Sequence, residues 1–273
     1  MWLRSLSCVA LLLLPCELLA QGLRVSTHVY DMVNRDPAGR EPMISSSLSL
    51  FHNTRVYDYV DAADEVIVFD PIRKDFTILN TAREICTTLT FEEIRHLLES
   101  RVPTVENYIQ DLNQQGNPSA AIIGESLRFQ LRPQFEQSFD AGSGRLTLTS
   151  PTWVYRVETR PWNQPEQVEK YLTCADWTAR LNHLMHPNSM FPEPRLALNQ
   201  AVRELKSRIP VSVELDLEPH QKMRLRAEHR FTQDIDDSDR RRIARWEKLL
   251  NAPSLRKMIF RSYQETVLLS QNR

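Results

Sequence analysis

Hydrophobic and polar residues alternate in several short stretches of the chain, which is the pattern of strands with one buried face. The clearest pair covers residues 211–217 and 223–231, on either side of a turn at Pro219 and His220. Acids dominate the polar face of the first segment and arginines that of the second, so we expect ion pairs between the two strands. The same pattern predicts strands at residues 23–33, 46–59 with a turn at His52 and Asn53, 65–69, 76–79, 85–89, 127–132, 146–149 and 153–157.

Hydrophobic residues at helical spacing separate the groups of strands. Thr90 and Glu93 have the spacing of a capping box, and the hydrophobic residues that follow continue at helical intervals. We expect Pro103 to interrupt this helix, because proline lacks the N–H that an inner helical position donates, and a second helical piece to continue to Leu112. Further helices are predicted at residues 165–184, 194–208, 239–250 and 254–269.

The order of these elements indicates an α+β protein. Strands follow strands rather than alternating with helices, so an antiparallel sheet covered by helices is favoured over a parallel α/β fold. No long flexible linker divides the chain, and we expect residues 21–273 to form a single domain with a helical C-terminal end.

The first residues have the pattern of a cleavable secretory signal. Arg4 gives the start a positive charge, residues 6–14 are almost wholly apolar, and Ala20 is a small residue at the expected cut. The apolar run is too short for a membrane span of about 20 residues. The alternatives are a buried N-terminal helix and a lipid anchor on Cys16, although the preceding proline is not the small residue that lipidation favours. We therefore expect a signal peptide at residues 1–20 and an exported mature protein, periplasmic or extracellular, with no membrane span.

Composition and charge exclude some classes of partner. The formal net charge of -1 provides no basic field for nucleic acid, so no nucleic-acid partner is expected. The chain has only 6 glycines, which argues against the glycine-built loops that bind phosphate groups. The remaining candidates for partners are a lipid, a lipoprotein or a protein of the cell envelope.

Two cysteines remain after removal of the leader. An oxidising compartment permits a disulfide between Cys86 and Cys174. The alternative is two buried thiols that are reduced or far apart. No CxxC spacing is present, so a zinc site at these cysteines is not expected.

None of the candidate metal sites in the sequence has all the ligands that the metal would need. His183 and His186 could turn toward one metal ion, but zinc needs at least a third protein ligand. The acidic residues at 234–239 lack the glycine and glutamate that a calcium loop requires. We interpret these acids as the start of a helix, with Asp237 or Ser238 as its N-cap. No metal and no cofactor are therefore expected.

Residues 45–89 resemble the succession of strands and turns in LolA-like lipoprotein carriers. The resemblance rests on an aromatic strand at residues 55–59, a strand that ends in Phe69-Asp70-Pro71, and a further strand at residues 76–79. In that family the turn carries a tyrosine where this chain has Phe69. The resemblance implies an exported protein whose curved antiparallel sheet surrounds helices that fill an apolar groove. It implies no specific binding residue.

We consider three functions. The first is an exported, non-enzymatic protein that binds or carries an apolar ligand or a lipoprotein, in a concavity of the sheet covered by residues 90–112. The second is a structural or interaction protein of the cell envelope with a fully packed sheet. The third is a hydrolase, for which Glu214, Asp216 and Glu218 are the best candidate carboxylates, although three acids on one strand are also typical of a solvated edge.

Overall fold

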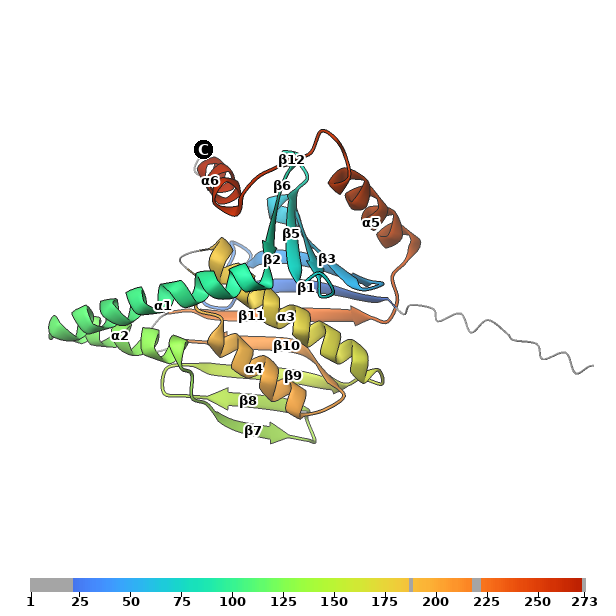
Figure 1. Cartoon of the computed structure of the whole chain (residues 1–273). Helices are drawn as coiled ribbons and strands as arrows, with labels where there is room; N and C mark the ends of the chain where they lie inside the picture. Colours follow the sequence, from blue (N-terminus) through green and yellow to red (C-terminus); the bar gives the residue numbers. More distant parts are fainter. Residues whose placement is uncertain (1–21, 187–188, 218–221, 272–273) are drawn as a thin grey trace, which may run out of the picture.

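The computed structural model describes residues 22–186, 189–217 and 222–271, so the predicted signal peptide at residues 1–20 lies outside the described residues. One sheet holds twelve strands in the order β12-β6-β5-β4-β3-β2-β1-β11-β10-β9-β8-β7 (Figure 1). All neighbouring strands in this sheet are antiparallel except β12 and β6, which are parallel. The strands are β1 (Leu23–Asp31), β2 (Met43–His52), β3 (Arg55–Val60), β4 (Glu65–Asp70), β5 (Asp75–Asn80), β6 (Ile85–Thr90), β7 (Glu136–Asp140), β8 (Arg145–Thr149), β9 (Val154–Pro161), β10 (Arg208–Asp216), β11 (Arg224–Thr232) and β12 (Arg256–Lys257).

Helices lie between and after the groups of strands, which together with the antiparallel sheet confirms the α+β class. Within the described residues, none of the helices combines the length and the hydrophobicity that a membrane crossing requires. The helices are α1 (Phe91–Gln114), α2 (Pro118–Leu131), α3 (Pro165–Met185), α4 (Glu193–Glu204), α5 (Asp237–Leu250) and α6 (Phe260–Gln271), with a short 3₁₀ turn at Asp61–Ala63.

The two faces of the sheet pack into different hydrophobic clusters, because successive residues of a strand point to opposite faces. On β3, Val56 belongs to the cluster that contains residues of α1, α3, α4 and α6, and we call this side the inner face. The next residue, Tyr57, belongs to the cluster that contains Ile243 and Trp246 of α5, and we call this side the outer face. Figure 1 shows α3 and α4 lying across the sheet, with the α1–α2 pair projecting beyond it.

The C-terminal segment at residues 251–271, which we call the C-terminal strap, passes around the free edge of β6. β12 pairs with β6 at the edge, and Met258 N donates to Cys86 O at 3.0 Å. On the inner face, Tyr263 of α6 is fully buried and its hydroxyl donates to Glu65 Oε1 at 2.6 Å. The strap therefore joins the outer-face helix α5 to the inner face, and Figure 1 shows α5 and α6 on opposite sides of β6.

Helix α1 differs from its prediction at Pro103. The predicted capping box is confirmed, since Glu93 N donates to Thr90 Oγ1 at 3.1 Å and Thr90 N donates to Glu93 Oε2 at 2.7 Å. The helix nevertheless runs through Pro103 without ending. Pro103 and Glu99, four residues earlier, are both exposed, so water can satisfy the Glu99 carbonyl that has no N–H partner.

The strand predicted at residues 127–132 is wrong, because residues 127–131 form the last part of helix α2 and Arg132 is its C-cap. Asn117 caps this helix, accepting from Ala120 N at 2.8 Å, and Pro118 occupies its first turn. Asparagine followed by proline can start a helix as well as follow one, as Asn117 and Pro118 do here. The strand was predicted because Leu127, Phe129 and Leu131 alternate with polar residues. The predicted helix at 254–269 is wrong at its start, where β12 precedes α6.

Candidate functional site

The β2–β3 and β4–β5 hairpin turns lie next to each other at one end of their strands, and we call this pair of turns the rim. The β2–β3 turn contains Asn53, whose φ of 55° lies in the left-handed region that asparagine tolerates. In the β4–β5 turn, the Asp70 carboxylate accepts from the backbone N–H groups of Ile72 and Arg73 at 3.1 and 3.0 Å. Arg55 Nε donates to Asp70 Oδ2 at 2.8 Å and so joins the two turns. The rim is therefore a braced edge with a cavity on each side.

On the inner side of the rim lies a cavity of about 440 Å³, which we call the inner cavity. The strand residues Leu23, Phe51, Val56 and Phe69 in its lining are apolar and buried, whereas the turn residues Asn53, Thr54, Pro71 and Ile72 are exposed. Helix α3 forms the opposite wall. Cavities of this size are typical of small-molecule sites. The sheet and turn residues in the lining include Leu23, Phe51, Val56, Phe69, Pro71 and Ile72, and the α3 residues are Glu166, Gln167, Glu169, Lys170 and Thr173.

All the α3 residues in the lining are polar, and their hydrogen-bonding groups are only partly satisfied. Gln167 is 4% exposed, and its Oε1 accepts from Trp162 Nε1 at 3.0 Å. Its Nε2 is buried and has no hydrogen-bond partner. The Lys170 ammonium is exposed and makes no ion pair within the part of the chain that the structure describes. Glu169, in contrast, is bound to Arg203 at 3.2 Å.

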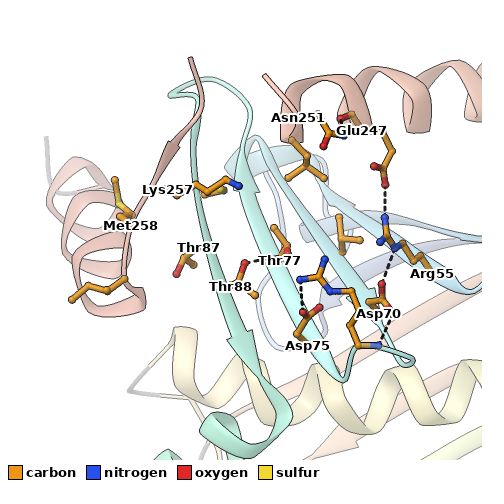
Figure 2. A pocket seen from close by; sticks show the side chains of 15 residues that line it. Arg55, Asp70, Asp75, Thr77, Thr87, Thr88, Glu247, Asn251, Lys257 and Met258 are labelled. Atoms are coloured by element: carbon orange, nitrogen blue, oxygen red, sulfur yellow. Dashed lines mark hydrogen bonds and ion pairs between the residues drawn. The ribbon is translucent and has the colours of Figure 1, made fainter. Parts of the chain in front are cut away.

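On the outer side of the rim lies a second cavity of about 550 Å³, the outer cavity, between α5 and the C-terminal strap. Figure 2 shows Arg55 between two of its acids: Arg55 Nη1 contacts Glu247 Oε1 at 3.0 Å and Arg55 Nε contacts Asp70. The third acid, Asp75, is bound by Arg73 at 2.9 Å. Because each carboxylate in this lining has an arginine partner, the outer cavity is a polar cleft held by its own ion pairs, and the inner cavity is the better candidate for an apolar ligand.

The two cysteines are not brought together. Both are buried free thiols. Cys86 belongs to the outer-face cluster and Cys174 to the inner-face cluster, so the sheet separates them. Burial raises the pKa of Cys174 to about 12 and also raises that of Cys86, which keeps both thiols protonated. The disulfide that the sequence permits is therefore absent from this structure.

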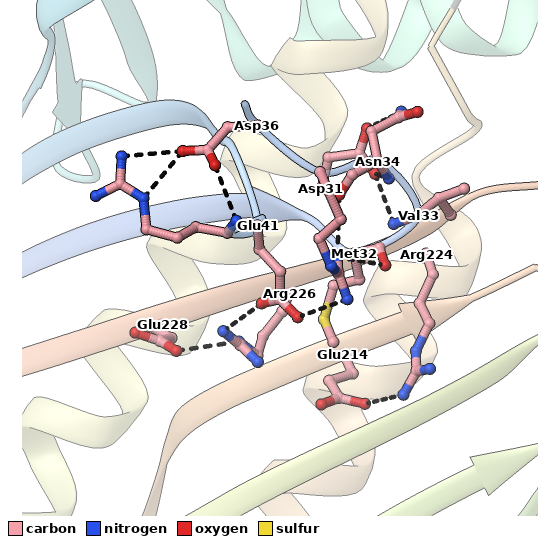
Figure 3. A network of polar contacts seen from close by, with 12 residues as sticks. Asp31, Met32, Val33, Asn34, Asp36, Glu41, Glu214, Arg224, Arg226 and Glu228 are labelled. Carbon is pink, nitrogen blue, oxygen red and sulfur yellow. Dashed lines mark hydrogen bonds and ion pairs between the residues drawn. The ribbon is translucent and has the colours of Figure 1, made fainter. Parts of the chain in front are cut away.

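The candidate hydrolase carboxylates lie on the outer face of β10, away from both cavities. Glu214 contacts Arg224 of β11 at 3.4 Å, and Asp216 contacts Arg156 of β9 at 3.1 Å. Figure 3 shows Glu214 within a wider network of acids and arginines, in which Glu41 of the loop before β2 also takes part. The predicted ion pairs across this hairpin are confirmed for Glu214. Glu218 lies outside the described residues.

The structure does not bring His183 and His186, the histidines considered as metal ligands, into a shared site. His183 is buried and stacks on Phe191 with ring centroids 4.3 Å apart, and its Nδ1 contacts the Met190 carbonyl at 3.1 Å. His186 is exposed. In the searched part of the chain, no group of three or more His, Cys, Asp or Glu residues could hold a metal ion.

The acidic residues at 234–239 do start a helix, but the predicted N-cap is wrong. The cap of α5 is Asp236, which accepts from Asp239 N at 2.8 Å, rather than Asp237 or Ser238. Asp239 itself is buried and pairs with Arg24 of β1 at 3.1 Å. The acidic cluster therefore starts a helix and ties that helix to the sheet.

A half-buried histidine on the inner face gives the fold a testable pH dependence. His229 Nδ1 contacts Thr27 Oγ1 at 3.0 Å, and its Nε2 is buried without a partner. Burial, and secondarily the charge of Arg195, lowers the pKa of His229 from 6.5 to about 3. The unfolded chain thus binds a proton that the folded chain does not, so stability is complete above pH 6.5 and is lost as the pH falls toward 3.

We expect acidification from pH 7.5 to pH 5 to reduce the free energy of unfolding more in the wild type than in His229→Gln, by about 2 kcal/mol. Urea unfolding of both proteins at the two pH values measures this difference. Since glutamine does not titrate, equal losses in the two proteins would show that His229 does not carry the effect.

Comparisons with known proteins leave the family of this chain open. No protein-family model matches the chain, and no curated protein matches it. The resemblance to LolA-like carriers stays a prediction, because neither result bears on it. The function is therefore inferred from the geometry of the two cavities.

Proposed function

We propose that this chain is an exported, non-enzymatic protein that binds or carries an apolar ligand in the inner cavity. The observation that carries the proposal is the composition of the cavity wall. Phe51, Val56 and Phe69 present a continuous apolar surface from neighbouring strands, since Phe51 pairs with Val56 and Val56 with Phe69. Burial of apolar ligand surface against such a wall contributes roughly 25 cal/mol per Å².

The position of the cavity favours ligand exchange. It lies at the rim, where the β4–β5 turn leaves Ile72 70% exposed, rather than in the middle of the inner-face cluster. Deeper on the same face the core is filled, as Phe91 of α1 stacks on Trp177 of α3 with ring centroids 3.8 Å apart. The helix that walls the cavity is thus α3, and not the segment at residues 90–112 that was expected to cover it.

A ligand-binding role also agrees with the chemistry of the described residues. Both cavities lack Glu214 and Asp216, the acids considered for hydrolysis, and those acids are bound by arginines. A protein of the cell envelope with a fully packed sheet needs no apolar cavity, so the inner cavity favours binding over scaffolding. We place the mature protein in the periplasm or outside the cell, where a lipid or the acyl chains of a lipoprotein are suitable ligands.

Thr173→Phe is the variant that tests this proposal. Thr173 is half-buried on the α3 wall, and a phenyl ring at this position would occupy part of the cavity. We expect the fluorescent apolar compound N-phenyl-1-naphthylamine to bind the wild type saturably and to bind Thr173→Phe at least ten times more weakly. Lipids extracted from the native protein are identified by mass spectrometry. Repeating the binding measurement on the delipidated protein then shows whether a bound lipid had blocked the site.

The matched control is Asn182→Phe, which adds the same ring to an exposed position of α3 that does not line the cavity. We expect its affinity for the compound to equal that of the wild type. Saturable binding that is equally strong in both variants would place the ligand elsewhere. Absence of saturable binding to delipidated wild-type protein would remove the proposed function.

A further inference from the structure

We infer that the ligand of the inner cavity carries a carboxylate at one end of its apolar chain, recognised by Gln167 and Lys170. This inference rests on the proposed function and names the class of ligand for that same site. It starts from two hydrogen-bond donors of the cavity wall, Gln167 Nε2 and the Lys170 ammonium, for which the described residues provide no partner.

Gln167 provides the first free donor. Indole N–H groups only donate, so the contact from Trp162 Nε1 at 3.0 Å fixes Oε1 as the acceptor of the Gln167 amide. Nε2, with two N–H groups, then lies on the other side of the amide, buried and without a partner. A buried polar group without a partner costs roughly 1–3 kcal/mol, and a ligand oxygen that accepts from Nε2 would recover this free energy.

Lys170 provides the second donor and a positive charge. It follows Gln167 by three residues on α3, so the two side chains lie on the same side of the helix. Both line the inner cavity, Gln167 as a buried group and Lys170 as an exposed one. A chain that fills the apolar part of the cavity could therefore present one oxygen to each of them.

The other charged groups of the lining are compatible with an anion. Arg55 is bound to Asp70 and Glu247, and Glu169 is bound to Arg203, so these side chains are occupied. Glu166 is exposed in the first turn of α3, where solvent screens its charge. The first turn of this helix also carries the positive end of the helix dipole, which favours an anionic group near Gln167.

A matched series of ligands tests this inference separately from the proposed function. Dodecanoate, dodecanol and dodecylamine share one chain and differ in the head group. We expect dodecanoate to displace N-phenyl-1-naphthylamine from the wild type at a concentration at least ten times lower than dodecanol, and dodecylamine to be the weakest. If the naphthylamine binds and dodecanol displaces it as well as dodecanoate, the proposed function stands and the carboxylate inference fails. If no compound binds the delipidated protein, the proposed function fails.

Variants assign the recognition to the two donors. We expect Lys170→Met to weaken dodecanoate binding about tenfold while leaving dodecanol binding unchanged, because only the carboxylate is charged. Gln167→Leu should also weaken dodecanoate binding about tenfold, and it should weaken dodecanol binding too, because the alcohol oxygen can accept from Nε2. Lys170 is exposed, so Lys170→Met should fold normally even if the buried Gln167 tolerates leucine poorly. Lys222→Met is the control, because it removes a lysine charge outside the cavity and should bind dodecanoate like the wild type. An equal loss for dodecanoate and dodecanol in Lys170→Met would overturn the inference.

Discussion

Replacing Tyr263 with alanine is expected to lower the free energy of unfolding by about 3–5 kcal/mol, as for other large buried aromatic residues. The Tyr263 side chain is fully buried against the inner-face cluster, and its hydroxyl donates to Glu65 Oε1 at 2.6 Å. The alanine variant therefore loses the packing of a whole ring and leaves the buried Glu65 carboxyl without this donor. Burial already raises the pKa of Glu65, so this carboxyl has little alternative solvation. Urea unfolding at pH 7 measures the change.

Two further variants separate the contributions at this position. Tyr263→Phe keeps the ring and removes only the hydroxyl, so its expected loss is smaller, about 1–3 kcal/mol. Tyr108→Ala removes a tyrosine that is 48% exposed on α1, and its effect should stay near 0.5 kcal/mol. Hydrogen exchange of residues 256–267 should rise in Tyr263→Ala, because Tyr263 is the inner-face anchor of the C-terminal strap. A loss in Tyr263→Ala no larger than that in Tyr108→Ala would show that the strap does not depend on this residue.

The strands could be predicted where one face is buried and local alternation is strong. The segments that became β4, β5 and β6 each alternate or run apolar between polar turns, and they pair as a meander in the predicted order. The capping box at Thr90 and Glu93 was predictable because both partners lie within one turn. These features depend on neighbours in the sequence, which is why pattern and spacing suffice for them.

Other features depend on partners that are remote in the sequence. β12 forms a strand only because Arg256 and Lys257 meet the edge of β6, and the sequence around them favours a helix equally well. Cys86 and Cys174 could be matched as a pair by elimination, but only the sheet between them shows that they face different clusters. The acidic composition of residues 234–239 predicted the start of a helix. Which of these residues caps the helix could be seen only in the folded structure.

The candidate site was predictable only in part. The sequence predicted the strands that carry Val56 and Phe69, and these residues do line the inner cavity, but it did not show which face of the sheet they share. Nothing in the sequence marked Gln167 or Lys170, since both are ordinary polar residues of an amphipathic helix. Their role depends on which turn of α3 lies opposite the rim, about a hundred residues away in the chain. Local patterns carry no information about that placement.

Trp246→Ala is the second substitution with a large expected effect, about 3–5 kcal/mol of unfolding free energy. Trp246 of α5 is 6% exposed and lies against the outer face of β3. Its ring stacks on Tyr59 and Tyr57 with centroids 5.7 and 6.3 Å apart, and such aromatic pairs contribute roughly 0.5–1.5 kcal/mol beyond the burial of area. The polar face of α5 adds the contact of Glu247 with Arg55, which is too exposed to hold the helix alone.

The consequence of Trp246→Ala should be local as well as global. Without the ring, α5 loses its main contact with the sheet, so hydrogen exchange of residues 237–250 should rise more than that of β3 and β4. Trp246→Phe retains a stacked ring and should recover more than half of the lost stability. Binding of the naphthylamine compound to the inner cavity, on the opposite face, should remain unchanged wherever the variant is folded, because Trp246 does not line that cavity. Unchanged exchange in α5 would mean that its polar contacts, Glu247 with Arg55 and Asp239 with Arg24, hold the helix without the tryptophan.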